Sequence, residues 1–186
     1  MTDFAIHTVD SAPEGARDTL RQVAAGYGFL PNLLGVMAEA PSLLKGYVAL
    51  SKLFSETSLS SHQQQVVLLA VSRFNDCEYC LAAHGMAARR AGLAPQIVAE
   101  LLDGRSLSDP DLEALRAFTV SVVESRGFPT LAETESFLAA GYSRANILEV
   151  ILGVGMKTLS NYTNHIAETP LDDVFRAEAT QASQRR

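Results

Sequence analysis

The sequence predicts a single all-α domain on the basis of three observations. Apolar residues recur at three- and four-residue spacing, helix-capping residues separate these stretches, and no stretch alternates in the way typical of a strand. The length of 186 residues suits one domain with a well-buried core and is too short for two independent domains. We therefore expect one helical bundle over residues 1–186, with a short leader at 1–13 and a tail at 176–186.

Prolines, capping residues and glycines predict where each helix begins and ends. Proline is favoured at the first position of a helix, and Ser or Thr followed three residues later by Glu or Gln forms a capping box. Glycine commonly ends a helix because it adopts the left-handed backbone conformation without strain. In chain order, helices are expected to begin at Glu14, Pro31, Pro41, the Ser60/Gln63 box, Asp76, Asp109-Pro110 and the Thr130/Glu133 box, and to end near Tyr27, Gly92, Gly104, Gly127 and Gly141.

The composition disfavours nucleic-acid and membrane partners. A net charge of -6 and a pI near 5.2 do not suit binding to a phosphate backbone, which requires clustered Lys and Arg. The most apolar window, residues 147–156, contains Glu149 and is far shorter than the roughly 18 apolar residues that a membrane span requires. The N-terminal residues lack the basic start and apolar run of a secretory signal, so we expect a cytoplasmic protein.

The residues best suited to chemistry are Cys77, Cys80 and His84. Asn75 and Asp76 favour helix starts over helix interiors, so Asp76 is expected to cap a new helix that holds Cys77 in its first turn. Residues three and four apart on a helix are neighbours, so the two thiols and the imidazole form one stripe. Two cysteines this close, in a reducing compartment, favour a redox or metal role over a structural disulfide.

Reversible oxidation of Cys77 and Cys80 is geometrically reasonable, because their helical spacing brings the two alpha carbons within disulfide range. His84 lies one turn after Cys80 and can take or return its proton, which favours Cys80 as the attacking thiol and Cys77 as the resolving thiol. The helix dipole favours the opposite order, since it lowers the pKa of a first-turn thiol. Two other interpretations stay open: a zinc site completed by His62 or His165, and a pair of buried, inert cysteines.

The chain also contains an internal similarity. With Gln65 aligned to Glu149, residues 66–84 run alongside residues 150–168 without a gap, and the apolar positions largely match. One interpretation is a pair of pseudo-repeated helical hairpins, of which only the first keeps the chemistry; the other is that two buried amphipathic helices align by chance. Asn161 and Asn164, which are aligned with Cys77 and Cys80, are expected to be capping groups; the less favoured alternative is that they reach the site through pseudo-symmetric packing of the two segments.

A resemblance to a known superfamily rests on the stretch LSSHQQQVVLLAVSRFNDCEYCLAAHGMAARRAGL. It resembles the core of the alkylhydroperoxidase D and carboxymuconolactone decarboxylase superfamily, whose pattern is a Glu, eleven residues, Cys-x-x-Cys, and a His four residues further on. Cys77, Cys80 and His84 fit this pattern, but Gln65 stands at the Glu position. The stretches GYGFLPNLLGVMAEAPSLLKGY and GVGMKTLSNYTNHIAETPLD resemble the longer, peroxidase-related members, so the resemblance covers about residues 20–175.

This resemblance implies an activity and a site. In the superfamily, the cysteine pair reduces hydroperoxides or cycles with a disulfide partner, and the Glu and His relay protons to the thiols. Gln65 can hold His84 through a hydrogen bond but cannot accept a proton at neutral pH, so weak peroxidase activity is expected. A second family histidine, found between the cysteines, is Tyr79 here. Glu149 is a candidate for the missing carboxylate if the two aligned halves pack across a pseudo-twofold axis.

The resemblance also implies the partners. They are a hydroperoxide substrate, a dithiol or disulfide-reductase partner, and further copies of the chain in a homo-oligomer, with no organic cofactor and no metal. Two other functions stay open. One is a decarboxylase or lactone-processing activity, which the intact Cys-x-x-Cys motif disfavours. The other is a redox-sensing or scaffold role, in which Gln65 has removed turnover.

Overall fold

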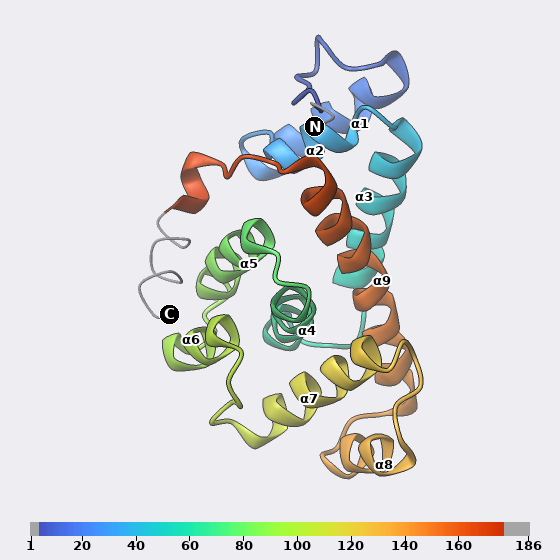
Figure 1. Cartoon of the computed structure of the whole chain (residues 1–186), viewed down its shortest axis with the longest axis vertical. Coiled ribbons are helices and arrows are strands. Elements are labelled where there is room, and N and C mark those ends of the chain that lie inside the picture. Colours follow the sequence, from blue (N-terminus) through green and yellow to red (C-terminus); the bar gives the residue numbers. More distant parts are fainter. Residues whose placement is uncertain (1–3, 177–186) are drawn as a thin grey trace.

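The computed structural model describes residues 4–176, so residues 1–3 and most of the predicted tail, 177–186, lie outside it. The described residues contain helices and no strand, which confirms the predicted all-α class (Figure 1). The elements are α1 (Glu14–Tyr27), α2 (Asn32–Met37), α3 (Pro41–Ser55), α4 (Ser61–Phe74), α5 (Glu78–Arg90), α6 (Pro95–Asp103), α7 (Pro110–Glu124), α8 (Leu131–Ala139), α9 (Arg144–Ala167) and the 3-10 helix η1 (Asp173–Phe175).

Helix α4 lies at the centre of the bundle and packs against α5, α6, α7 and α9 (Figure 1). Its residues from Val66 to Ser72 are all buried, as expected of a helix with neighbours on every side. Helix α3 packs against α9 and α1, and α2 lies near the C-terminal end of α9. Consequently Gln65, at the edge of this buried run, lies among the helices of the core.

Local capping signals agree well with the structure. The predicted boxes at Ser60/Gln63 and Thr130/Glu133 are both present, and Asp109 accepts hydrogen bonds at the start of α7. Helix α1 has the predicted bounds. A further box, Ser143 with Asn146, begins α9 and had not been singled out in the sequence. The glycines with a left-handed backbone are Gly28, Gly92, Gly104, Gly127 and Gly141.

The aligned internal segments do not form equivalent hairpins. Residues 66–84 span the end of α4, a tight turn and the start of α5, whereas residues 150–167 continue along the single helix α9. The first segment breaks at Asp76, whose φ of 53° lies in the left-handed region. In the second segment Leu159 and Ser160 occupy the places of Asn75 and Asp76 and continue the helix. The predicted hairpin repeat is therefore wrong, because matching apolar positions do not carry the helix break.

A glycine sets how closely α9 approaches its neighbours. A Cβ atom added at Gly153 would lie 2.8 Å from both Phe54 of α3 and Val67 of α4, closer than real Cβ contacts allow. The absence of a side chain at Gly153 thus lets α9 press against both helices. Lys157 follows one turn later on the same face of α9, and it is 1% exposed.

Two hydrophobic clusters form the core. One gathers residues of α4, α6, α7 and α9, and the other gathers residues of α1, α2, the start of α5 and η1. Cys77, Tyr79 and Cys80 belong to the second cluster, and Tyr47 of α3 packs against both. No single described helix is long and apolar enough to span a membrane; α8 and α9, bent by 113°, meet that test only as a pair.

Candidate active site

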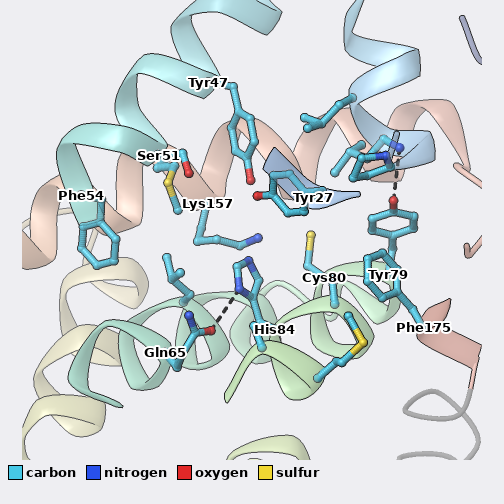
Figure 2. A pocket seen from close by; sticks show the side chains of 18 of the residues that line it. Tyr27, Tyr47, Ser51, Phe54, Gln65, Tyr79, Cys80, His84, Lys157 and Phe175 are labelled. Atoms are coloured by element: carbon cyan, nitrogen blue, oxygen red, sulfur yellow. Dashed lines mark hydrogen bonds between the residues drawn. The ribbon is translucent and has the colours of Figure 1, made fainter. Parts of the chain in front are cut away.

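A cavity of about 360 Å³ lies between the two hydrophobic clusters. Helices α1, α3, α4, α5 and α9 and the 3-10 helix η1 all contribute to its wall (Figure 2). Its polar groups include the Cys80 thiol, the His84 imidazole, the Gln65 amide and the Lys157 ammonium. Six aromatic side chains line the rest, an apolar surround typical of small-molecule sites: Tyr27, Phe29, Tyr47, Phe54, Tyr79 and Phe175.

The turn between α4 and α5 places the two thiols differently from the prediction. The amide of Cys77 donates a hydrogen bond to the carbonyl of Ser72 at 2.9 Å, which closes the turn, and Asp76 takes the left-handed conformation inside it. As a result Cys77, not Asp76, is the N-cap residue of α5. Cys80 is the third residue of the helix, so Cys80 receives the favourable field of the helix N-terminus.

The two cysteines have different environments. Neither is part of a disulfide in this structure; Cys77 is fully buried, and Cys80 is 2% exposed but lines the cavity. A hydrogen bond from the Cys77 thiol to the Cys80 sulfur raises the pKa of Cys77, and burial raises it further. The same hydrogen bond lowers the pKa of Cys80, and the charge of Lys157 lowers it further against the opposing effect of burial. The cavity thus faces the thiol that is more readily ionised.

His84 and Gln65 are brought together as the sequence predicts. The His84 Nδ1 and the Gln65 Oε1 are 3.2 Å apart, so Nδ1–H donates to the amide oxygen (Figure 2). This bond leaves Nε2 without a proton and free to accept hydrogen bonds. Burial lowers the pKa of His84 well below its usual value, and the charge of Lys157 lowers it further. His84 is therefore a neutral imidazole at pH 7.

Two residues of α9 complete the site: Lys157, which was not predicted for it, and Asn161, for which a capping role was preferred. Figure 2 shows the Lys157 side chain reaching over His84 toward Cys80. Asn161 is fully buried and accepts a hydrogen bond from Asn75 at 2.9 Å, and its amide also lowers the pKa of Cys80. Asn161 therefore reaches the site, which was the less favoured of its two predicted roles, and it does so from the single helix α9. The sequence shows only the helical spacing between Gly153 and Lys157, and the burial of both residues is seen only in the structure.

Tyr79 connects the cavity wall to the C-terminal segment through a hydrogen bond and a ring contact. Its hydroxyl donates a hydrogen bond to the Asp172 carboxylate and accepts one from the Leu33 amide at 3.2 Å. Asp172 also accepts hydrogen bonds from the Asn32 amide at 3.1 and 3.2 Å. The Tyr79 ring packs edge-to-face on Phe175, with centroids 5.8 Å apart. Burial, together with the bond to Asp172, raises the pKa of Tyr79, so its hydroxyl stays protonated.

Glu149 does not lie at this site. Its carboxylate accepts hydrogen bonds from the amide and hydroxyl of Ser58 at 2.7 and 2.8 Å and from Asn146 at 2.8 Å. These bonds hold the pKa of Glu149 below its usual value despite the opposing effect of burial. The proposed replacement of the family carboxylate by Glu149 is therefore wrong, because it depended on a pseudo-twofold packing that α9 does not adopt.

The histidines considered for a zinc site lie elsewhere. His62 Nε2 is 2.8 Å from the Ala91 carbonyl oxygen, and His165 is exposed on α9. Within residues 4–176 no group of three or more His, Cys, Asp or Glu side chains is arranged to hold a metal ion. Cys77, Cys80 and His84 are therefore best considered as a thiol site.

Comparisons with known proteins agree with the all-α fold. Residues 41–120 match the model of the carboxymuconolactone decarboxylase family. The fold is similar to the alkylhydroperoxidase AhpD core of an uncharacterized peroxidase-related protein from Ralstonia eutropha JMP134, with a TM-score of 0.83 and 19% identity over 92% of this chain and 93% of that one. It is also similar to a peroxidase-related protein from Silicibacter sp. TM1040, with a TM-score of 0.79 and 20% identity over 93% and 92% of the two chains.

A third similar structure is a cysteine-to-alanine variant of the debrominase Bmp8 in complex with 2,3,4-tribromopyrrole. Its TM-score is 0.81, with 16% identity over 98% of this chain and 97% of that one. At these identities the likeness shows the fold. The chain has no significant match among curated proteins.

Proposed function

We propose that this chain is a member of the alkylhydroperoxidase D-like and carboxymuconolactone decarboxylase superfamily and that it is a thiol–disulfide oxidoreductase that reduces hydroperoxides. The family match over residues 41–120 and the fold shared with two peroxidase-related proteins support the proposal. The observation that carries the proposal is the placement of the two thiols. Cys80 lies in the wall of an apolar cavity with its pKa lowered, and Cys77 lies behind it as a protonated partner. A thiolate is the form that attacks peroxides, and an adjacent thiol can close a disulfide.

The proposed reaction has three steps. The Cys80 thiolate attacks the terminal oxygen of the hydroperoxide, the O–O bond breaks, and the alkoxide takes a proton and leaves as an alcohol. The Cys77 thiol then attacks the Cys80 sulfenic acid, which forms the disulfide and releases water. A dithiol finally reduces the disulfide and is itself oxidised. Since Cys80 faces the cavity and Cys77 does not line it, we expect the reductant to attack the Cys80 sulfur.

His84 and Gln65 have positioning roles in this proposal. The neutral His84 can accept a hydrogen bond from the terminal O–H of the peroxide through Nε2. Gln65 holds the ring in the required tautomer but cannot take up a proton. Because the relay ends at an amide, turnover should be slower than with a carboxylate at position 65.

Single-cysteine variants test the attacking order. After exposure to cumene hydroperoxide, Cys77→Ser should retain a sulfenic acid on Cys80, whereas Cys80→Ser should leave Cys77 reduced, as judged by dimedone labelling and mass spectrometry. The parent should lose both thiols and recover them with dithiothreitol. If both thiols of the folded parent remain reduced, the proposed function is refuted. A stable sulfenic acid on Cys77 but not on Cys80 would reverse the order.

The aromatic lining favours one second candidate, the reductive dehalogenation of an aromatic ring. The same dithiol would supply two electrons: the carbon–halogen bond breaks, a carbon–hydrogen bond forms, halide leaves and the disulfide is produced. This candidate rests on the six rings of the cavity and on the fold similarity to Bmp8. Release of bromide from a brominated pyrrole, with no disulfide formed by hydroperoxide, would favour it. A decarboxylase is less well supported, since it would leave the dithiol without a role.

We also propose that the chain forms a homo-oligomer. Several large apolar side chains on one face of α9 are exposed, and such a face is commonly covered by a partner. Light scattering after size exclusion should give a mass above that of one chain, and a monomer would contradict the proposal. The exposed side chains are Leu148, Ile151, Tyr162 and Ile166.

A further inference from the structure

The buried cation of the cavity needs an electrostatic partner. Lys157 is 1% exposed, and burying an unpaired ammonium is strongly unfavourable. Among the ion pairs formed within residues 4–176, none joins Lys157 to a carboxylate. The other cation of the cavity wall, Arg90, is exposed at the end of α5. Lys157 is therefore the buried positive charge of the cavity wall.

The groups around Lys157 identify its partner. Helix α5 presents Cys80 and His84, α4 presents Gln65, and α3 presents Tyr47 (Figure 2). His84 is neutral. Burial raises the pKa of Tyr47 and of Tyr27 on α1, and the nearby charge of Cys80 raises that of Tyr47 further, so none of these three supplies a negative charge at neutral pH. Gln65 does not ionise. Cys80 is the one group in this set that can carry a negative charge at neutral pH.

We propose that Lys157 is a catalytic residue: its ammonium pairs with the Cys80 thiolate and then gives a proton to the oxygen that leaves the peroxide. This inference rests on the proposed function and extends it, since neither the thiols nor the imidazole provides that proton. The position of Lys157 is determined by α9, which Gly153 holds against α3 and α4.

The protons balance over one cycle. Cys80–S⁻ and ROOH give Cys80–SOH and RO⁻, and Lys157–NH₃⁺ converts RO⁻ to ROH and becomes Lys157–NH₂. Cys77–SH and Cys80–SOH then give the disulfide and water. Reduction by a dithiol returns Cys77–SH and Cys80–SH, and the Cys80 proton passes to Lys157–NH₂. The resting ion pair is restored, and the net reaction is ROOH plus dithiol giving ROH, water and disulfide.

Two variants separate the two roles of the ammonium. Lys157→Met removes the charge and the proton, and Lys157→Arg keeps a charge that is a poor acid because the guanidinium stays protonated. Lys52→Met is the matched control, since Lys52 is exposed on α3. Circular dichroism and thermal unfolding establish that each variant is folded. Lys157→Arg provides the ion-pair test if Lys157→Met does not fold.

Iodoacetamide tests the ion pair without peroxide. In a Cys77→Ser background, the rate of Cys80 alkylation against pH gives the ionisation of a single thiol. Lys157→Met should move the midpoint toward the ordinary thiol pKa of about 8.5 and slow alkylation at pH 6.5 at least about tenfold. Lys157→Arg and Lys52→Met should keep the parent midpoint. An unchanged midpoint in Lys157→Met would overturn the ion pair, as would a shifted midpoint in a folded Lys157→Arg protein.

Peroxide at pH 9 tests the proton donor in chains that keep both cysteines. At that pH Cys80 of Lys157→Met is again ionised, so alkylation should match the parent while disulfide formation with cumene hydroperoxide stays at least about tenfold slower. Equal rates of disulfide formation would overturn proton donation by Lys157. If the parent forms no disulfide with peroxide, the proposed function and proton donation both fail, while the alkylation midpoint still decides the ion pair.

Discussion

At the scale of single residues, Gln65 determines how His84 ionises. The amide oxygen accepts a hydrogen bond from the His84 Nδ1–H and adds no charge, while burial and the charge of Lys157 both lower the pKa of the imidazole. A carboxylate in the same place would accept the same hydrogen bond, and its negative charge would favour the imidazolium form of His84. The difference between an amide and a carboxylate at position 65 therefore changes the protonation state of the site more than its geometry.

We expect Gln65→Glu to raise the pKa of His84 and to increase the rate of peroxide-driven disulfide formation. The rate should gain a pH dependence near neutrality that the parent lacks, because the carboxylate extends the proton relay beyond the imidazole. Stopped-flow measurement of disulfide formation from pH 5.5 to 8.5 tests this expectation. Gln22→Glu, which adds the same charge at an exposed site of α1, is the control. A Gln65→Glu rate that equals this control at every pH would contradict the expectation.

At the scale of elements, the approach of α9 to α3 and α4 depends on Gly153. An added methyl group would lie 2.8 Å from Phe54 and Val67, whereas a methyl group at Gly155 of the same helix would meet nothing within 4 Å. Both glycines lie within α9, so alanine improves helix propensity equally at the two positions. The pair therefore separates close packing from propensity.

Gly153→Ala should lower the free energy of unfolding by about 1–2 kcal/mol. Overpacking the contact costs about 1–3 kcal/mol, which outweighs the gain in helix propensity of up to about 1 kcal/mol. Gly155→Ala should raise it by up to about 1 kcal/mol. Urea unfolding measures both. Gly153→Ala should also slow Cys80 alkylation, since Lys157 lies one turn further along the displaced helix. Equal stability of the two variants would show that α9 accommodates a methyl group at position 153 without loss of packing against α3 and α4.

The elements also show what the sequence could and could not predict. The boxes at Ser60 and Thr130 were predicted because each depends on residues three apart. The motif and the two helices that carry it predicted that four side chains lie close together: Cys77, Cys80, His84 and Gln65. Lys157 was missed because a lysine on an apolar helix shows its role only once the facing helix is known.

Asp76 and Glu149 were misplaced for different physical reasons. For Asp76, the capping preference was outweighed by a tight turn that its left-handed conformation makes possible, which moved the cap to Cys77. Glu149 was placed by aligning apolar positions, and that alignment did not show that the helix break at Asp76 is missing from α9. The Glu149 carboxylate instead accepts hydrogen bonds from the amide and the hydroxyl of Ser58.

At the scale of the whole molecule, the neutral His84 makes stability depend on pH. In the folded protein the pKa of His84 lies well below the value of about 6.5 that applies to the unfolded chain. Below pH 6.5 the unfolded chain therefore binds a proton that the folded protein does not. The contribution of this group to stability is fully present above pH 6.5 and is lost as the pH falls toward the folded pKa.

We expect the parent to lose up to about 1.4 kcal/mol per pH unit from His84 as the pH falls below 6.5. His84→Gln cannot titrate, so its free energy of unfolding should fall less steeply between pH 7 and pH 5. His165→Gln, which replaces an exposed histidine of α9, should keep the parent slope. Denaturant unfolding at several pH values measures the slopes. A parent and His84→Gln with identical slopes would refute this assignment.

The bond between Tyr79 and Asp172 joins residues 93 positions apart, and it has a consequence during synthesis. Cys77 and Cys80 leave the ribosome well before the segment that closes their cavity. At about 5–20 residues per second, that delay is on the order of 5–20 s. For this interval the nascent chain carries a dithiol that Asp172 and Phe175 do not yet cover.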